Sequence, residues 1–129
     1  MKVFKTKEFV RFARREKVAD ARLCEAVNRA VRGLIDADLG GGLIKQRIAR
    51  PGQGRSGGYR ALMAFRSGYR AVFVYGFAKS ERGNIGRDEL GFWRRVSTAF
   101  LRMDEVRLVL MIDRLELKEV SCDEESDVP

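Results

Sequence analysis

Two strand-like runs on either side of a Ser-Gly pair constrain the fold of this chain more than any other feature. Residues 59–66 (YRALMAFR) and 69–77 (YRAVFVYGF) are rich in β-favouring residues and alternate as strands do. Ser67-Gly68 between them suits a two-residue hairpin connection. The sequence therefore predicts an antiparallel hairpin over these residues.

Three further strands are expected. LIKQRIA at 43–49 alternates so that Lys45 and Arg47 share one face, while the other face is largely apolar. Residues 2–6 have the pattern of a short edge strand, and residues 115–120 have that of a last strand. Together with the hairpin, these segments predict a small, twisted and mainly antiparallel sheet.

Two helices are expected before the central strands. Apolar residues recur at intervals of three and four from Lys7, and again after Asp20, which we expect to be the N-cap of a helix running to Ile35. The run Gly40–Gly42 is expected to end that helix, because glycine adopts the left-handed conformations of a helix terminus without strain. These two helices should pack as a pair on one side of the sheet.

Helical spacing returns near the C-terminus. A helix is expected after Asn84, with a break near Asp104 and a second short helix over 106–112. The whole order of elements predicts the α+β class, with a single domain over 1–120. Residues 121–129 form an acidic tail that we expect to be disordered.

The net charge of the chain is concentrated in one segment. The formal net charge is +8, and between Leu43 and Arg82 nine basic residues accompany one acidic residue, Glu81. Such a segment suits a phosphate backbone. The alternative is a set of solvated arginines that keep a small sheet soluble, although solvated faces ordinarily mix both signs of charge. The residues that we expect to share one concave patch are Lys45, Arg47, Arg60 and Arg66.

A glycine-rich loop, RPGQGRSGGYR at 50–60, leads into the hairpin. Its glycines allow tight turns that present backbone amides to an anion, and Arg55 and Arg60 flank them with bidentate donors. It is not a Walker loop, because the Gly-Lys-Ser/Thr ending is missing. A purely structural role as the entry to the hairpin is an equal alternative for the glycines.

The residue types that are missing limit the chemistry. The chain has no histidine, which excludes imidazole acid-base catalysis and histidine metal sites, and it has no carboxylate or cysteine pair, so no metal or cofactor is expected. Cleavage of RNA remains feasible, because the substrate supplies its own 2′-hydroxyl nucleophile. Arginine and lysine can stabilise the phosphorane electrostatically.

The cysteines and the hydropathy pattern indicate the cellular compartment in which we expect the protein. Cys24 and Cys122 belong to no close pair, which favours free thiols in a reducing cytoplasm. The N-terminus lacks the apolar run of a signal peptide, and no segment has the ~18 to 20 apolar residues of a membrane span. We therefore expect a soluble cytoplasmic protein without a membrane partner.

Four segments resemble a known family. GGLIKQRIA, GRSGGYRAL, YGFAKSERGNI and ELGFWRRV, within roughly Lys2 to Glu105, are similar to the RelE/ParE superfamily of type II toxin-antitoxin toxins, most of all to its RelE-type branch. The resemblance implies a compact toxin that cleaves messenger RNA, usually on the ribosome. Such a toxin inhibits translation and growth, and a cognate antitoxin neutralises it.

The resemblance also assigns roles to residues. Arg60 and Lys79 become the central phosphate and transition-state groups, and Glu81 a weaker acid-base candidate; the expected aromatic position falls on Tyr75 or Phe77. The full catalytic set is Arg60, Lys79, Arg55 and Glu81. The RNA-binding set is Lys45 and Arg47, which the resemblance supports, with Arg66 and Arg82 added from the basic segment. Two alternatives stay open, a topoisomerase-poisoning toxin of the ParE type and an RNA-binding domain without catalysis.

Overall fold

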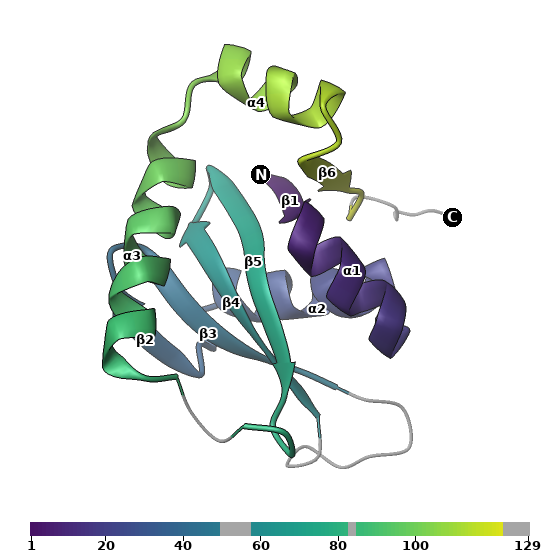
Figure 1. The fold of residues 1–129 in the computed structure, drawn as a ribbon, viewed down its shortest axis with the longest axis vertical. Coiled ribbons are helices and arrows are strands. Elements are labelled where there is room, and N and C mark those ends of the chain that lie inside the picture. Colours follow the sequence, from purple (N-terminus) through teal and green to yellow (C-terminus); the bar gives the residue numbers. More distant parts are fainter. Residues whose placement is uncertain (50–57, 83–84, 123–129) are drawn as a thin grey trace.

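A six-stranded sheet separates two layers of helix in the computed structural model, which describes residues 1–49, 58–82 and 85–122 (Figure 1). The strands lie in the order β2-β3-β4-β5-β1-β6, and all neighbours are antiparallel except β1 and β5. The strands are β1 Lys2–Thr6, β2 Ala37–Gly40, β3 Leu43–Ile48, β4 Tyr59–Arg66, β5 Arg70–Ala78 and β6 Leu117–Val120. The helices are α1 Lys7–Glu16, α2 Asp20–Val31, α3 Arg87–Arg102 and α4 Glu105–Asp113. The predicted α+β class is confirmed.

The central hairpin is formed by β4 and β5. Its loop is one residue longer than predicted, because Arg66 pairs with Arg70 and leaves Ser67, Gly68 and Tyr69 to make the connection. The Tyr69 N–H donates to the Arg66 carbonyl at 3.0 Å, and Gly68 has a φ of +76°. Glycine is favoured there because few other residues adopt a positive φ.

A β-bulge interrupts the pairing of β4 with β5. Leu62 pairs with Tyr75 while Met63 pairs with Phe73, so Val74 is an extra residue on β5. The bulge shifts the alternation of side chains, as an inserted residue must. As a result Phe73 lies in the core beneath α1 and α2, whereas Tyr75 packs in the core beneath α3.

The N-terminal helices cover one face of the sheet. Phe9 and Phe12 of α1 and Leu23 of α2 are buried there, against residues of β3, β4 and β5. Gly76 makes this contact close, since a Cβ at that position would lie 2.5 Å from the ring of Phe12. The predicted helical pair on one side of the sheet is thus confirmed.

The boundaries predicted for the second helix were wrong. Its N-cap is Ala19, and the carboxylate of Asp20 instead accepts a hydrogen bond from the Lys5 ammonium at 2.7 Å. The helix ends at Val31, and Gly33, with a φ of +82°, follows that end. Apolar spacing continued to Ile35 in the sequence because this residue still packs partly against the core after the helix has ended.

The run of three glycines forms a strand connection and not a helix end. Gly40, Gly41 and Gly42 have φ values of +88°, +65° and +80° and join β2, which the sequence did not predict, to β3. A Cβ on Gly42 would lie 2.4 Å from a methyl carbon of Leu101. The glycines therefore allow α3 to lie close to this turn.

The N-terminal strand was predicted to be an edge strand, but β1 lies between β5 and β6. The edge position is taken by β6, which begins at Leu117 and not at Leu115. Pairing with β5 stops at the Lys5–Phe73 pair, because β1 ends at Thr6 and the chain turns into α1. Within the described residues, no strand pairs with this side of β5 beyond Phe73.

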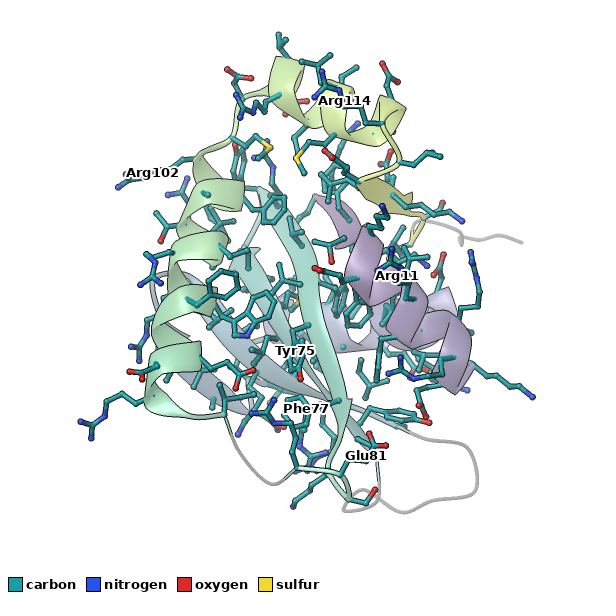
Figure 2. All side chains as sticks on the ribbon, in the orientation of Figure 1. Arg11, Tyr75, Phe77, Glu81, Arg102 and Arg114 are labelled. Carbon is teal, nitrogen blue, oxygen red and sulfur yellow. A yellow bond between two sulfur atoms is a disulfide. The ribbon has the colours of Figure 1, made fainter. Side chains whose placement is uncertain are left out.

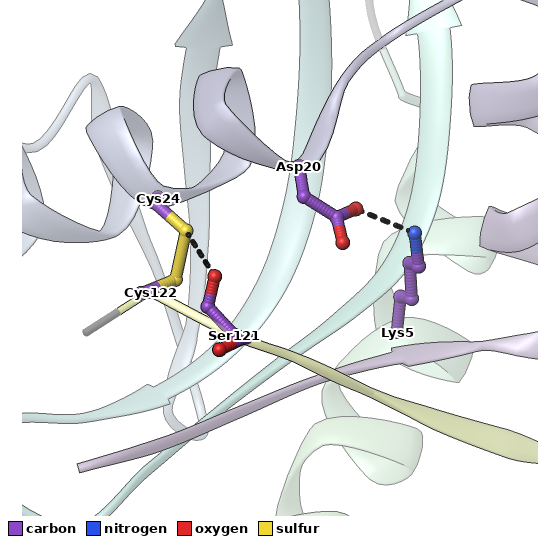
Figure 3. Close-up of a disulfide and its surroundings, with 5 residues drawn as sticks. All are labelled: Lys5, Asp20, Cys24, Ser121 and Cys122. Atoms are coloured by element: carbon purple, nitrogen blue, oxygen red, sulfur yellow. Dashed lines mark hydrogen bonds and ion pairs between the residues drawn. A yellow bond between two sulfur atoms is a disulfide. The ribbon is translucent and has the colours of Figure 1, made fainter. Parts of the chain in front are cut away.

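A disulfide joins Cys24 of α2 to Cys122, with a sulfur-sulfur distance of 2.05 Å (Figure 3). The expectation of two free thiols is therefore wrong, and a reducing compartment no longer follows from the cysteines. No local pattern indicates the pair, because 98 positions separate the two residues and only the folded chain brings the end of β6 beside α2. The rest of the predicted tail, residues 123–129, lies outside the described residues.

A buried arginine fixes the C-terminal end of α3. The Arg70 side chain is 2% exposed, and its Nη1 donates to the carbonyls of Phe100 at 2.8 Å and Met103 at 2.7 Å. Nη2 donates to the Glu105 carboxylate at 3.1 Å, at the start of α4. Helix termini leave carbonyls without intrahelical partners, and Arg70 supplies donors to them.

We expect Arg70→Met to lower the free energy of unfolding by about 3 to 5 kcal/mol, because the substitution leaves buried carbonyls and an end of α3 without their donor. Denaturant titration of the purified protein measures the change. Arg102→Met is the matched control, since Arg102 is exposed and points away from the body of the molecule (Figure 2). Its effect should stay within about 0.5 kcal/mol, and an equal loss in both variants would contradict the assigned role of Arg70.

The disulfide should also contribute to stability. Replacing both cysteines with serine should lower the free energy of unfolding by about 2 to 5 kcal/mol, because the bond closes a long loop in the unfolded chain. A reducing agent should destabilise the wild type by a similar amount and leave the double variant unchanged. Identical unfolding midpoints for the wild type with and without reductant would show that the bond contributes nothing.

Candidate nucleic-acid interface

Two arginines face each other on adjacent strands of the sheet. Arg47 of β3 pairs in register with Arg60 of β4, and Lys45 lies two residues away on the same face of β3. This is the face that α3 covers in part, because Leu43 and Leu62 on the same face pack in the core with Phe100. The structure thus brings together three of the four basic residues predicted to share a patch.

The fourth residue lies elsewhere. Arg66 is at the opposite end of β4 from Arg60, about 20 Å away at the ~3.3 Å rise of a strand residue. Its guanidinium lies 5.4 Å from the centre of the Tyr69 ring, beside the hairpin loop. The expected patch therefore does not extend to Arg66.

The side chain of Arg60 is nearly buried, although the sequence predicted a solvent-exposed position. Its side chain is 8% exposed, and its Nη1 donates to the Tyr59 carbonyl at 3.2 Å. Burial, together with the positive charge of Arg47, lowers the pKa of Arg60, and the carboxylate of Asp36 partly offsets that effect. The prediction of an open, solvated position is therefore wrong for Arg60, whose neighbours include Asp36, Arg47 and the paired Phe77.

One carboxylate lies against both arginines. Asp36 Oδ1 is 3.9 Å from Arg47 Nη2, and Asp36 Oδ2 is 3.8 Å from Arg60 Nε. The side chain of Asp36 is 26% exposed. Sequence reasoning missed this residue because Asp36 precedes the unpredicted strand β2, in a stretch interpreted as the end of a helix.

Aromatic residues border the arginine pair. Phe77 pairs in register with Arg60, and the ring centres of Phe77 and Tyr75 are 5.8 Å apart. The Tyr75 ring stacks on Trp93 of α3 with centres 5.2 Å apart. Both candidates for the expected aromatic position therefore lie on the arginine face, on the same strand (Figure 2).

Arg82 is held by an ion pair at the start of α3. Its two terminal nitrogens donate to the two carboxylate oxygens of Glu89 at 2.6 and 3.1 Å, and Nη1 also donates to the Tyr75 hydroxyl at 3.0 Å. The hydrogen bond with Glu89 raises the pKa of Arg82, and the same bond lowers the pKa of Glu89. Sequence reasoning placed Arg82 among RNA ligands but missed Glu89, whose only local sign is its place in the first turn of a helix.

The other predicted site residues lie in or near the turn after β5. Lys79 and Glu81 have exposed side chains, and the Lys79 N–H lies 3.4 Å from the Gly58 carbonyl. Gly58 has a packing role, since a Cβ there would lie 2.5 Å from the carbonyl oxygen of Ile48. Arg55 and the glycines at 52, 54 and 57 lie outside the described residues.

A groove of about 870 Å³ adjoins this cluster. Its floor is the part of β5 beyond the end of β1, and α1 and α3 form its walls. The groove thus continues from the aromatic cluster toward α1, which carries Arg11 (Figure 2). Its lining includes Tyr75, Phe77, Arg82, Trp93, Arg11 and Arg15.

Over residues 1–49, 58–82 and 85–122, no three acidic or cysteine side chains gather in a way that could hold a metal ion. No helix in the same ranges is long and apolar enough to cross a membrane.

Comparison with known proteins identifies the family. A search of curated proteins found no match to the chain. The family model described as the RelE toxin of the RelE / RelB toxin-antitoxin system matches residues 1–120, which is nearly the whole chain. The chain therefore belongs to the RelE toxin family of toxin-antitoxin systems.

Proposed function

We propose that this toxin is an endoribonuclease that cleaves messenger RNA on the ribosome, inhibits translation and arrests growth until a cognate antitoxin neutralises it. The observation that carries the proposal is the pair of guanidinium groups of Arg47 and Arg60, which stand opposite each other on adjacent strands. Membership of the RelE toxin family supports the same conclusion.

The arginine pair suits a scissile phosphate. Guanidinium groups offer parallel donors that match phosphate oxygens, and they retain their charge throughout a reaction. Arg60 is nearly buried, so its charge acts through a medium that screens less than water does. The pair can thus neutralise the charge that develops on a pentavalent phosphorane.

The remaining cations would bind the RNA on either side of that phosphate. Lys45 continues the basic face along β3, and Lys79 stands exposed beyond the end of β5, next to the start of β4. Cleavage by attack of the 2′-hydroxyl needs neither a metal nor a cofactor. It leaves a 2′,3′-cyclic phosphate and a 5′-hydroxyl.

One experiment separates this proposal from its alternatives. After brief induction of the toxin, new 5′-hydroxyl ends in cellular messenger RNA are expected. Damaged DNA with intact messenger RNA would instead indicate a topoisomerase poison of the ParE type, and neither change would indicate RNA binding alone. Cleavage of a model messenger RNA by purified toxin, with and without ribosomes, tests ribosome dependence directly.

Arg60→Ala should reduce the cleavage rate by a factor of about 100 to 1000, which corresponds to about 2.7 to 4 kcal/mol of transition-state stabilisation. Because Arg60 is nearly buried, thermal unfolding must show that the variant is folded. Arg66→Ala is the matched control and should retain most of the activity, since Arg66 lies at the far end of the same strand. Equal losses in the two variants would contradict the proposed site.

Substitutions of Lys79 can distinguish a role in neutralising phosphate charge from a role in transferring a proton. Lys79→Ala should weaken cleavage, and Lys79→Arg should restore most of the rate if the ammonium only neutralises phosphate charge, because arginine keeps its proton. Single-turnover rates on the model messenger RNA measure both variants. An arginine variant as inactive as the alanine variant would make Lys79 a proton-transfer group.

A further inference from the structure

The carboxylate that lies between the two site arginines has no role in the function proposed so far. Asp36 contacts Arg47 and Arg60 at 3.9 and 3.8 Å. These separations are longer than hydrogen bonds, so the contacts are electrostatic and do not occupy the guanidinium donors, of which Arg60 Nη1 donates to the Tyr59 carbonyl. A phosphate bound by the two arginines would therefore lie next to an acceptor oxygen supplied by the protein.

We propose that Asp36 is a catalytic residue that accepts the proton of the attacking 2′-hydroxyl of RNA. This inference rests on the proposed ribonuclease function. It also replaces Glu81, the acid-base candidate suggested by the sequence, with a carboxylate that contacts the phosphate-binding pair.

The backbone that carries Asp36 is anchored from within the protein. The Asp36 N–H donates to the side-chain oxygen of Gln46 at 2.9 Å, and Gln46 is only 1% exposed. The Gln46 amide nitrogen in turn donates to the carbonyls of Ala26 at 3.0 Å and Leu34 at 3.2 Å. A buried glutamine thus ties the segment before β2 to α2 and to β3, which holds the carboxylate at a fixed place beside the arginines.

Other carboxylates near the site are less suited to this role. Glu89 is engaged by both terminal nitrogens of Arg82. Glu81 stands exposed in the turn after β5, and Asp38 of β2 accepts a hydrogen bond from the Gly40 N–H at the end of the same strand. Among the described residues, Asp36 is the carboxylate that the salt-bridge geometry places against Arg60.

The groups that face Asp36 are cationic. Arg47 of β3 and Arg60 of β4 face it directly, Lys45 continues the basic face, and Arg29 of α2 donates to the carbonyl of Arg47. A phosphate held by the two facing guanidinium groups would place the neighbouring 2′-hydroxyl within reach of this carboxylate.

The proposed step balances without a further reactant. The 2′-oxygen forms a bond to phosphorus as its proton passes to an Asp36 oxygen, and the bond between phosphorus and the 5′-oxygen breaks. The leaving oxygen takes the bonding electron pair and receives a proton from water. The carboxylic acid of Asp36 then returns its proton to solvent.

Asp36→Asn provides the test, because asparagine keeps the shape of the side chain and removes the proton acceptor. The probe is the model messenger RNA that wild-type toxin cleaves, and its 2′-deoxy analogue at the mapped site measures binding without cleavage. We expect the single-turnover rate to fall about 100- to 10 000-fold, with binding of the analogue unchanged or tighter. Asp38→Asn makes the same change of charge two residues away and should cleave nearly at the wild-type rate.

The outcomes separate this inference from the proposed function. An Asp36→Asn variant that is folded and cleaves like the wild type would overturn the role of Asp36 and leave the ribonuclease proposal intact. A variant that loses analogue binding in parallel with cleavage would make Asp36 a group that only positions the arginines, which also overturns it. If the wild type itself does not cleave RNA with or without ribosomes, the proposed function fails, and this inference fails with it.

Discussion

The bulge at Val74 is the constraint on which the candidate site depends. It inserts one residue into β5, so that Tyr75 packs beneath α3 and Gly76 accepts the ring of Phe12 from the opposite side. Without the extra residue, strict alternation would turn Tyr75 and Phe77 toward α1 and α2. The aromatic border of the arginine pair therefore exists because the extra residue in β5 shifts the pairing with β4 by one position from Tyr75 onward.

The position of α3 follows from contacts along its whole length. Arg70 binds the carbonyls at its C-terminal end, the glycine turn after β2 lies against its middle, and the Arg82–Glu89 pair ties its first turn to the segment after β5. A helix held in this way packs over Leu43 and Leu62 on the arginine face. On the same face Arg60, in a strand with neighbours on both sides, is nearly buried, while Arg47 remains a third exposed.

Local patterns in the sequence predicted most elements, because periodicity and turn chemistry depend on neighbours in the chain. The hairpin strands, α1, α3 and α4 were found in this way. Features that depend on distant contacts were not found. The disulfide needs β6 beside α2, β2 is too short to show a pattern, and the bulge depends on the pairing of two strands. At the candidate site, the basic residues could be recognised in the sequence as a run of charge. Their carboxylate partners Asp36 and Glu89 could not, because they lie outside that run.

The carboxylate partners change how the charge of the basic segment, residues 43–82, is interpreted. Four of its described arginines lie near acids from outside it: Arg47 and Arg60 near Asp36, Arg82 near Glu89 and Arg70 near Glu105. A count of charge along the sequence therefore overstates the positive charge that an RNA would meet. Arg70 belongs to the structure of the protein, and Arg82 is committed to Glu89. For the proposed ribonuclease, the described cations next to the scissile phosphate are Arg47, Arg60 and Lys45, a localised set that favours recognition of one phosphate over coverage of a long backbone.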